Sequence, residues 1–351
     1  MGRIWLITDT HFGLKGDNEE WLNDYVGYFK DTVIPFMRKE YRDGDILVHC
    51  GDVFDNRATV GLNTLTDVIY LFEDFASIFK DIRITVGNHD SMKKSSNDVS
   101  SVNILKDIPN IKIYYEPEVE TICGKTILFN PWIEDLEKEK RLLQSVDVDY
   151  IFGHLSVGGS QTCSKVGVKM KLTAGVSVSD FKNAQVYAGH IHIKQDMKNV
   201  HYLGNPYHKD RGDIGNPKGI TILDIETGKT EFIENTYSPR YMKESIYDIL
   251  DFTIGDLKER WNKGRINLYG NSEDINVCNF DMLRESLCSY YREFNPVGEK
   301  NVTILNEDSK SGFETAKTGE DYVEEFLDQQ DMEPEFRRKV MEKLESYRDR
   351  L

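Results

Sequence analysis

The sequence predicts an α/β fold in which β-sheets are flanked by helices. Five short segments are rich in β-branched and aromatic residues and nearly continuous in apolar character, which is typical of sheet-core strands. Longer stretches between the first three segments, at residues 19–41 and 62–81, carry apolar residues at spacings of three and four, as amphipathic helices do. The first half of the chain therefore alternates strand and helix. The predicted strands are RIWLI (3–7), DILVHC (45–50), IRITV (82–86), DYIF (149–152) and QVYA (185–188).

Two later regions predict hairpins, one around Gly124 and Lys125 and one over residues 219–238. A polar region with helical and extended pieces follows residue 240, and SKSGFETAKTGE is typical of a linker. The stretch from Asp321 to the last residue predicts two amphipathic helices interrupted near Pro334. We therefore expect a large domain (1–240), a small α+β domain (241–308), a linker (309–318) and C-terminal helices (319–351).

The composition restricts the classes of protein that fit. The formal net charge is −16 over 351 residues, which disfavours a protein that grips nucleic acid with a basic face. Bound divalent cations would weaken this objection, because they carry local positive charge themselves. No apolar run is long enough to cross a bilayer, and five cysteines without a C-x-x-C pair argue against a disulfide framework. We expect no secretion signal, no membrane association and a location in the reducing cytoplasm.

Each predicted strand ends directly in residues of metal-ligand type. In open α/β sheets, sites form beyond the carboxyl ends of the strands, so these side chains are expected to converge. Any one fragment is weak, since Gly, Asn and Asp also populate ordinary turns. The repetition at five strand ends, which includes five of the eight histidines, favours one shared site. The set is Asp9, His11, Asp52, Asp55, Asn88, His89, Asp90, His154, His190 and His192.

These residues form the pattern D-x-H, GD-x-x-D, GNHD, GH and GH-x-H, in that order from Asp9 to His192. The pattern resembles that of the calcineurin-like metallophosphoesterase superfamily. The resemblance implies a double β-sheet sandwich flanked by helices, with residues 1–240 as the catalytic domain, residues 241–308 as a small α+β capping domain that positions DNA, and a C-terminal helical segment.

The same resemblance implies a site for two divalent metal ions. Asp9, His11 and His192 hold one ion, Asn88, His154 and His190 hold the other, and the Asp52 carboxylate bridges both. Mixed nitrogen and oxygen ligands suit manganese, with magnesium as the alternative. Two ions about 3.5 to 4 Å apart can acidify a shared water and neutralise the phosphoryl oxygens. By the same resemblance His89 is the general acid, and we expect Asp90 to orient it; the alternatives are a further ligand or a packing residue.

Within the superfamily, the chain is most similar to the nuclease subunits of recombination complexes of the SbcCD and Mre-Rad type, and particularly to the bacteriophage version. The strings that carry this similarity are ITDTHFG, GDVFDNR, NPW, FGHL, AGHIH and YLGNPY. The similarity implies a DNA nuclease, exonuclease or endonuclease, that acts in DNA repair and recombination as a homodimer. It also implies an ATPase partner whose coiled-coil base binds the C-terminal helices, and the host cytoplasm as the location if the protein is encoded by a phage.

One residue departs from this pattern. Cellular members often carry histidine three residues after the bridging aspartate, where this chain has Asp55, so any help in holding the substrate phosphate must come from elsewhere. Basic residues near the motifs are candidates for contacts to a nucleic-acid backbone. The alternative for each is an ordinary solvated side chain. Besides Asp55, the candidates are Arg57, Lys93, Lys94, and the lysines of a Gly-rich stretch expected to be a mobile loop, Lys165, Lys169 and Lys171.

Two other functions fit the fold. The first is a protein phosphatase or a cyclic-nucleotide phosphodiesterase. Phosphoprotein phosphatases typically show GD-x-x-DRG and GNHE, whereas this chain has GDVFDNR and GNHD. The second is a non-catalytic scaffold, which usually loses ligands, while all seven are present here. The sequence leaves open the cleavage polarity, the strand requirement, ATP dependence and the physiological metal.

The terminal helices generate a first prediction. Truncation from Thr318 should abolish binding of the ATPase partner, because the apolar stripes of these helices are expected to dock in a groove of that partner. Metal-dependent hydrolysis should persist. Co-purification with the partner measures binding, and hydrolysis by the truncated protein measures activity. If the truncated chain bound the partner as well as the full-length chain does, the C-terminal helices would not be the docking segment.

Overall fold

The computed structural model describes residues 2–93, 96–165, 167–278 and 280–299. Lys94, the predicted linker (309–318) and the predicted C-terminal helices (319–351) lie outside the described residues. The described residues all belong to one compact unit. In the part of this unit that is described, no helix is long and apolar enough to cross a membrane.

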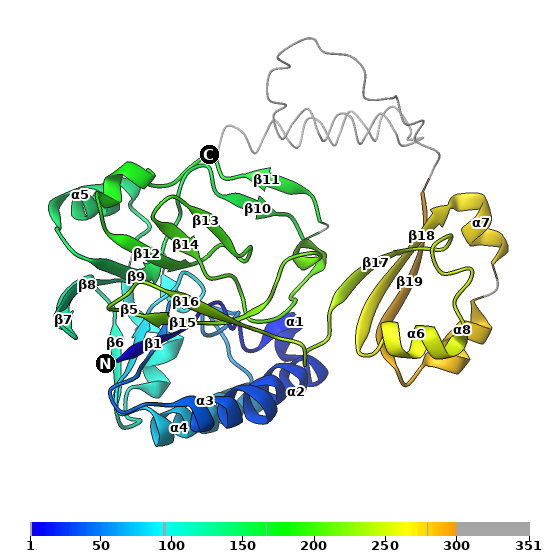
Figure 1. Ribbon diagram of the computed structural model, residues 1–351, viewed down its shortest axis with the longest axis horizontal. Coiled ribbons are helices and arrows are strands. Elements are labelled where there is room, and N and C mark those ends of the chain that lie inside the picture. Colours follow the sequence, from blue (N-terminus) through cyan, green and yellow to red (C-terminus); the bar gives the residue numbers. More distant parts are fainter. Residues whose placement is uncertain (1, 94–95, 166, 279, 300–351) are drawn as a thin grey trace, which may run out of the picture. The chain divides into compact units, whose positions relative to one another are not determined.

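A six-stranded sheet contains the first three predicted strands (Figure 1). Its order is β16-β15-β1-β2-β3-β6, in which β1, β2, β3 and β6 are parallel and β15 and β16 are antiparallel. The β15–β16 hairpin confirms the hairpin predicted over residues 219–238. The strands are β1 (Arg3–Ile7), β2 (Ile46–His49), β3 (Ile82–Thr85), β6 (Ile111–Tyr114), β15 (Gly219–Asp224) and β16 (Thr230–Glu234).

A second six-stranded sheet contains the other two predicted strands. Its order is β13-β14-β12-β9-β8-β7, with β8, β9, β12 and β14 parallel and an antiparallel strand at each edge. The β7–β8 hairpin turns at Cys123 and Gly124, which confirms the second predicted hairpin. The strands are β7 (Glu118–Ile122), β8 (Lys125–Asn130), β9 (Tyr150–His154), β12 (Gln185–Gly189), β13 (Gln195–Met197) and β14 (Val200–Tyr202).

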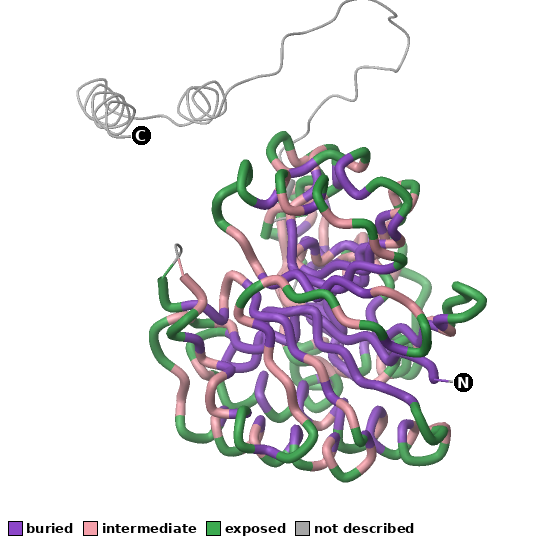
Figure 2. Tube along the Cα trace, turned by 90° about the vertical axis from the view of Figure 1, so that its left-hand side faces the viewer, coloured by how far each residue is buried: buried purple, intermediate pink, exposed green. Residues whose placement is uncertain are grey.

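The two sheets pack face to face through apolar side chains. Along β1, Ile4 and Leu6 belong to the apolar cluster shared with Phe129 and Phe152 of the second sheet. Trp5 and Ile7, which point to the opposite face, join the cluster under the helices. Both faces of the strand are therefore buried, as the continuous apolar pattern predicts. Figure 2 shows these buried strands in purple, between exposed outer segments in green. The double-sheet sandwich is confirmed.

Helices cover the outer face of each sheet (Figure 1). The first sheet is covered by α2 (Glu19–Tyr28), α3 (Ile34–Glu40) and α4 (Leu62–Ile78), after the short α1 (Leu14–Asp17). The second is covered by α5 (Leu136–Ser145). The helix predicted over residues 19–41 forms, but residues 29–33 widen into a π-helical turn that ends two residues before Pro35. Proline lacks the N–H that continues an α-helical ladder, so a local widening accommodates it.

Two short hairpins border the sandwich. One pairs β4 (Ser91–Lys93) with β5 (Ser96–Ser100), directly after GNHD. The other pairs β10 (Gln161–Cys163) with β11 (Lys169–Lys171). The Gly-rich stretch that we expected to be a mobile loop is thus organised as a hairpin, because its ends pair through backbone hydrogen bonds that the sequence pattern does not reveal.

Residues 241–299 form a small α+β lobe. Its strands β17 (Tyr241–Ser245), β18 (Gly264–Asn271) and β19 (Tyr291–Glu299) make a parallel sheet in that order. Its helices are α6 (Ile254–Arg260), α7 (Ser272–Val277) and α8 (Asp281–Leu287). The lobe has an apolar cluster of its own around Trp261. Its role as a capping domain stays a prediction.

A buried carboxyl group on the helix that covers the second sheet makes stability depend on pH. Glu139 of α5 is 3% exposed, and its Oε1 accepts a hydrogen bond of 3.2 Å from Nδ2 of Asn130. Burial raises the pKa of Glu139 from 4.5 to about 8 against the opposing effect of this hydrogen bond. A carboxyl with a raised folded-state pKa stabilises the fold fully below its unfolded pKa, and this stabilisation is lost as the pH rises from about 4.5 to about 8.

Glu139→Gln should therefore unfold at higher urea concentration than the wild type at pH 9, by a free energy on the order of a few kcal/mol. The difference should shrink toward pH 4.5. The exposed Glu137 on the same helix provides a matched control, since Glu137→Gln removes a carboxyl that is not buried and should not reproduce the gain in stability at pH 9. A Glu139→Gln profile parallel to that of the wild type would contradict the assignment.

Candidate metal centre

The loops after β1 and β2 run side by side and place the first candidate ligands. The amide of Asp9 donates to the carbonyl of Gly51, and the amide of His11 donates to the carbonyl of Asp52, each at 3.0 Å. Asp9, His11 and Asp52 adopt φ angles of 50°, 43° and 56°. Such left-handed conformations cost energy for residues other than glycine and persist where the surrounding structure holds them, typically at functional sites.

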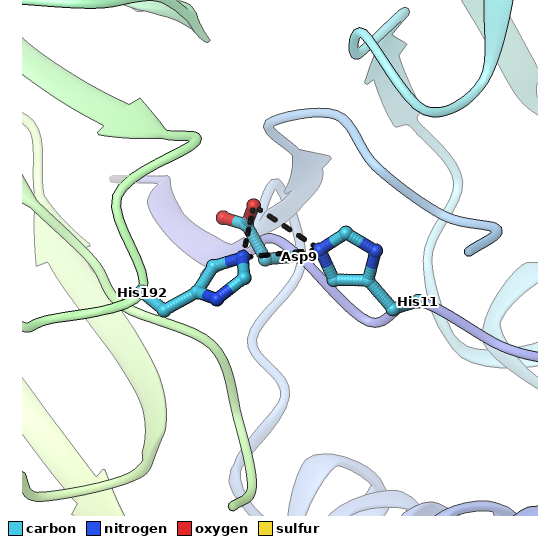
Figure 3. A group of neighbouring side chains, drawn as sticks. All are labelled: Asp9, His11 and His192. Atoms are coloured by element: carbon cyan, nitrogen blue, oxygen red, sulfur yellow. Dashed lines mark hydrogen bonds and ion pairs between the residues drawn. The ribbon is translucent and has the colours of Figure 1, made fainter. Parts of the chain in front are cut away.

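Asp9, His11 and His192 meet at the first cluster (Figure 3). Oδ1 of Asp9 lies 3.7 Å from Nε2 of His11 and 3.6 Å from Nε2 of His192. The two imidazole nitrogens are 3.1 Å apart. The Asp9 and His11 side chains are fully buried, whereas His192, in the loop after β12, is 29% exposed. The three side chains point toward one another from two different sheets.

Asn88, His154 and His190 meet at the second cluster. Oδ1 of Asn88 lies 2.9 Å from Nε2 of His154 and 2.9 Å from Nδ1 of His190. Nδ1 of His154 lies 2.9 Å from the Cys50 carbonyl, which can only accept, so this nitrogen carries a hydrogen. In the neutral ring, Nε2 of His154 then keeps its lone pair toward Asn88.

Asp52 lies between the two clusters. Its Oδ2 is 3.6 Å from Nε2 of His11 and 3.3 Å from Nε2 of His154. Its Oδ1 accepts a hydrogen bond of 2.7 Å from the amide of His89. One carboxylate therefore touches both clusters, and its orientation is held by the GNHD loop.

The spacing of these atoms fits two divalent cations. Ligand atoms about 2.1 Å from an ion lie roughly 3.0 to 3.4 Å from one another in octahedral or tetrahedral geometry. The contacts in the two clusters range from 2.9 to 3.7 Å. The donors are imidazole nitrogens, carboxylate oxygens and one amide oxygen, which suit manganese and similar ions. The seven residues predicted as ligands are thus brought together, and they could hold one ion in each cluster with Asp52 between them.

The charges of the two clusters are strongly coupled. Burial disfavours the charged form of His154, but the Asp52 and Asp9 carboxylates more than offset this and raise the pKa of His154 to about 9. Burial also disfavours a charged Asp52, but the imidazoles of His154 and His11 hold its pKa well below the usual range. Burial lowers the pKa of His190 to about 4. A cation that binds here displaces the proton of His154, so its affinity rises with pH.

Two glycines of the motifs allow the loops to approach. A Cβ on Gly87 would lie 2.2 Å from the amide nitrogen and Oδ1 of Asp52. A Cβ on Gly189 would lie 2.0 Å from Oγ1 of Thr8 and 2.9 Å from Oδ2 of Asp9. Any side chain at either position would push the acidic ligands out of place, which explains glycine in GNHD and AGHIH.

Asp90 does not orient His89 as we expected. Its Oδ2 accepts hydrogen bonds of 2.9 Å from the amides of Asp52 and Gly87, and its Oδ1 accepts one of 3.1 Å from Phe54. Burial, followed by the nearby Asp52 charge, raises the pKa of Asp90 to about 7. Asp90 therefore ties the loop after β2 to the GNHD loop. Its short side chain turns toward backbone amides because three of them converge there.

His89 is oriented by Asp55 instead. Nδ1 of His89 lies 2.6 Å from the backbone carbonyl of Asp55, so it donates to that oxygen. The Asp55 carboxylate lies 3.3 Å from Nδ1 of His11. Asp55 thus contacts one histidine through its backbone and another through its side chain, and such contacts set which ring nitrogen stays free.

A pocket of about 590 Å³ opens beside the clusters, and His89 lies in its wall. Of the predicted substrate contacts, Asp55 and Lys165 line the pocket. Lys169 and Lys171 are exposed on β11, and Lys93 is exposed on β4, outside the residues that line it. Arg57 is half-buried in the loop that precedes α4. Lys94 lies outside the described residues.

Two further lysines were missed by the sequence analysis. Lys209 lines the pocket, and Lys218 is buried behind it. Nζ of Lys218 donates to the His192 carbonyl at 2.8 Å and contacts Oδ1 of Asp213 and Oδ1 of Asn205. The available signal was position, since both follow shortly after YLGNPY, one of the strings singled out in the sequence.

Comparisons with known proteins identify a family and several similar proteins. The calcineurin-like phosphoesterase family matches residues 2–194, which include all seven candidate ligands. Exonuclease subunit 1 of Enterobacteria phage T4 is 27% identical over 259 residues, which cover 72% of this chain and 74% of that protein. A solved archaeal phosphodiesterase aligns over 66% of this chain and 99% of its own, with 17% identity and a TM-score of 0.34. A phosphopantetheinyl hydrolase from Mycobacterium tuberculosis aligns over 58% of this chain and 90% of its own, with 12% identity and a TM-score of 0.32.

The buried ion pair behind His192 generates a stability prediction. The Lys218 and Asp213 side chains are 2% and 4% exposed, and although burial favours the neutral acid, the Lys218 ammonium lowers the pKa of Asp213 to about 2. Lys218→Met leaves a buried carboxylate without its cation, so the free energy of unfolding should fall by about 3 to 5 kcal/mol in urea.

Two variants control this experiment. Nζ of Lys182 also donates to a carbonyl, that of Val146 at 2.8 Å, but Lys182 is exposed, so Lys182→Met should cost less than about 0.5 kcal/mol. Adding Asp213→Asn to Lys218→Met should restore part of the lost free energy of unfolding, because the carboxylate without a cation is then removed. If Lys218→Met unfolded at the wild-type urea concentration, the ion pair would not stabilise the loop of His192.

Proposed function

The chain belongs to the calcineurin-like phosphoesterase family, and we propose from this that it is a metal-dependent DNA nuclease. It is a phosphoester hydrolase of a family that uses divalent metal ions. The observation that carries the proposal is the pair of ligand clusters that share Asp52 at the wall of an open pocket. The name of the phage relative, an exonuclease subunit, supports DNA as the substrate.

In this proposal Asp9, His11 and His192 hold one ion, and Asn88, His154 and His190 hold the other, with Asp52 bridging. Manganese is the proposed physiological metal, since the donor set mixes nitrogen and oxygen. When bound, two such cations supply Lewis acidity toward the phosphoryl oxygens and acidify water for in-line attack. The distances within each cluster support the division of ligands between the two positions.

His89 is the proposed general acid. Its Nδ1 is engaged by the Asp55 carbonyl, so Nε2 is the atom that can deliver a proton to the leaving oxygen. Burial lowers the pKa of His89, while the Asp52 charge opposes this. A phosphodiester anion beside the ring, like the Asp52 carboxylate, favours the charged imidazolium. The proton is then transferred from Nε2 as the phosphorus–oxygen bond breaks.

The biological setting is a further part of the proposal. We propose a homodimeric nuclease subunit that acts in DNA recombination and repair together with an ATPase subunit of the SbcC or Rad type. The printed name of the phage relative describes it as a subunit, which supports an assembly. The net charge of −16 supports a partner that contributes positive surface toward DNA.

The proposal is tested with purified full-length protein and end-labelled duplex and single-stranded DNA, in Mn²⁺ or in chelator. Cleavage should require the metal. His89→Asn should lower kcat by about 10² to 10⁴ while two ions per chain remain bound. Asp52→Asn should lose cleavage and weaken the binding of both ions, measured by calorimetry.

A matched histidine serves as the control. His201 on β14 pairs with Asp196 at 2.7 Å and lies outside both clusters, so His201→Asn should cleave DNA at the wild-type rate. If His89→Asn cleaved DNA with the wild-type kcat, His89 would not be the general acid. A small phosphodiester or phosphoprotein hydrolysed far faster than DNA would favour a phosphatase or diesterase instead.

A further inference from the structure

The pocket beside the metal centre contains a lysine that the proposed chemistry leaves without a function. Lys209 lies between β14 and the short 3-10 turn Arg211–Asp213, and its side chain is 11% exposed. It lines the pocket together with Lys15, Lys165, Asp55 and His89. In a chain with a formal charge of −16, a cation enclosed at this place calls for an explanation.

The ammonium group of Lys209 has only a distant ion-pair partner among the described residues. Within the described part of the chain its ion-pair partner is Oδ1 of Asp55, at 3.9 Å, which is beyond hydrogen-bond distance. Lys218, by contrast, has three oxygen partners close to its Nζ. A largely enclosed ammonium is costly unless it is hydrogen-bonded to an anion. Lys209 is therefore suited to receive a negative group from the pocket.

The backbone around Lys209 is held firmly. Its amide donates to Oδ2 of Asp213 at 2.7 Å, and Asp213 is itself paired with Lys218. Asp210, the next residue, accepts at Oδ1 from the amide of Gly212 at 2.8 Å. The main acidic groups of this wall are thus engaged with the protein. They fix the position of Lys209 without neutralising its ammonium.

The position of Lys209 relative to His11 indicates which phosphate it would bind. Asp55 contacts Nδ1 of His11, whereas Nε2 of the same ring faces Asp9 and Asp52. The imidazole ring thus separates Asp55, the contact of Lys209, from the point where the metal ligands meet. A cation placed there suits the phosphate next to the scissile one on the same strand.

We propose that Lys209 binds the phosphate that flanks the scissile phosphodiester, with Lys165 lining the same pocket. The inference rests on the proposed nuclease function and adds the nucleic-acid backbone contact at this site. Lys209 thus makes a contact to a phosphate of the nucleic acid that Asp55, which is acidic, cannot make. The ammonium donates hydrogen bonds to non-bridging oxygens and positions the strand without reading its sequence.

The test compares two substrates that differ in this phosphate. An oligonucleotide has a flanking phosphate, whereas bis(p-nitrophenyl) phosphate has only the scissile one. Lys209→Met in the full-length protein with Mn²⁺ should lower kcat/KM for the oligonucleotide roughly ten- to a hundredfold, the usual worth of a hydrogen bond to a charged group. Hydrolysis of bis(p-nitrophenyl) phosphate should stay within about twofold of wild type, and Lys209→Arg should recover most of the loss.

Salt dependence supplies a readout that a structural role would not change. With Ca²⁺ replacing Mn²⁺, the affinity for a fluorescent single-stranded oligonucleotide is measured by anisotropy over a range of salt concentrations. Loss of one phosphate contact should reduce the slope of log affinity against log salt by about 0.7. Lys80→Met is the matched control: Lys80 is 79% exposed, pairs with Asp43 at 2.7 Å, and precedes β3, at the edge of the sheet opposite the GNHD loop. Its slope should equal that of the wild type.

The outcomes separate the two proposals. Suppose that the wild-type protein cleaves the oligonucleotide. If Lys209→Met then lowers kcat/KM equally for both substrates, or for neither, the flanking-phosphate contact is overturned and the nuclease proposal stands. An unchanged salt slope for Lys209→Met likewise overturns the contact. If the wild type hydrolyses bis(p-nitrophenyl) phosphate but neither binds nor cuts oligonucleotides, both proposals fall. Circular dichroism of Lys209→Met confirms that it is folded.

Discussion

The shared Asp52 carboxylate is the interaction on which the site depends. One oxygen contacts His11 and His154, which belong to different sheets, and the other accepts the His89 amide. Its backbone amide donates to Asp90, and its carbonyl accepts from His11. Three loops and the end of β9 are therefore joined through one residue. Because Asp52 is buried and charged, its position is stable only while imidazoles or cations surround it.

The rest of the sandwich serves to hold these loops under strain. Asp9, His11, Asp52 and His190 all have positive φ angles, which a free loop would avoid. Backbone hydrogen bonds between the loops after β1 and β2 hold the first three, and the amide of His190 donates to the Asp9 carboxylate, which holds the fourth. The strands beneath are buried on both faces, so the ends from which the loops depart are rigid.

Two lysines in one wall illustrate how an acidic chain manages local charge. Lys218 is enclosed by oxygen atoms and supports the backbone of His192, so it acts within the protein. Lys209 is held by its backbone and has a distant carboxylate partner, so its charge remains directed toward the pocket. Net charge describes the average surface, but binding depends on the few charges that are enclosed near the ligand.

The sequence alone determined five of the strands, the helical stretches over residues 19–41 and 62–81, both predicted hairpins and the residues that converge. Periodicity and turn residues are local properties, and the ends of parallel strands share one edge. The tertiary structure decided which groups contact one another. Asp90 was expected to orient His89, but its carboxylate accepts hydrogen bonds from three backbone amides of two loops instead. The stretch with Lys165 folded into a hairpin, and Lys209, which follows one of the singled-out strings but was not itself predicted as a contact, came to line the pocket. These outcomes depend on which groups meet across long sequence separations, and a linear pattern of residue types carries no information about distance in space.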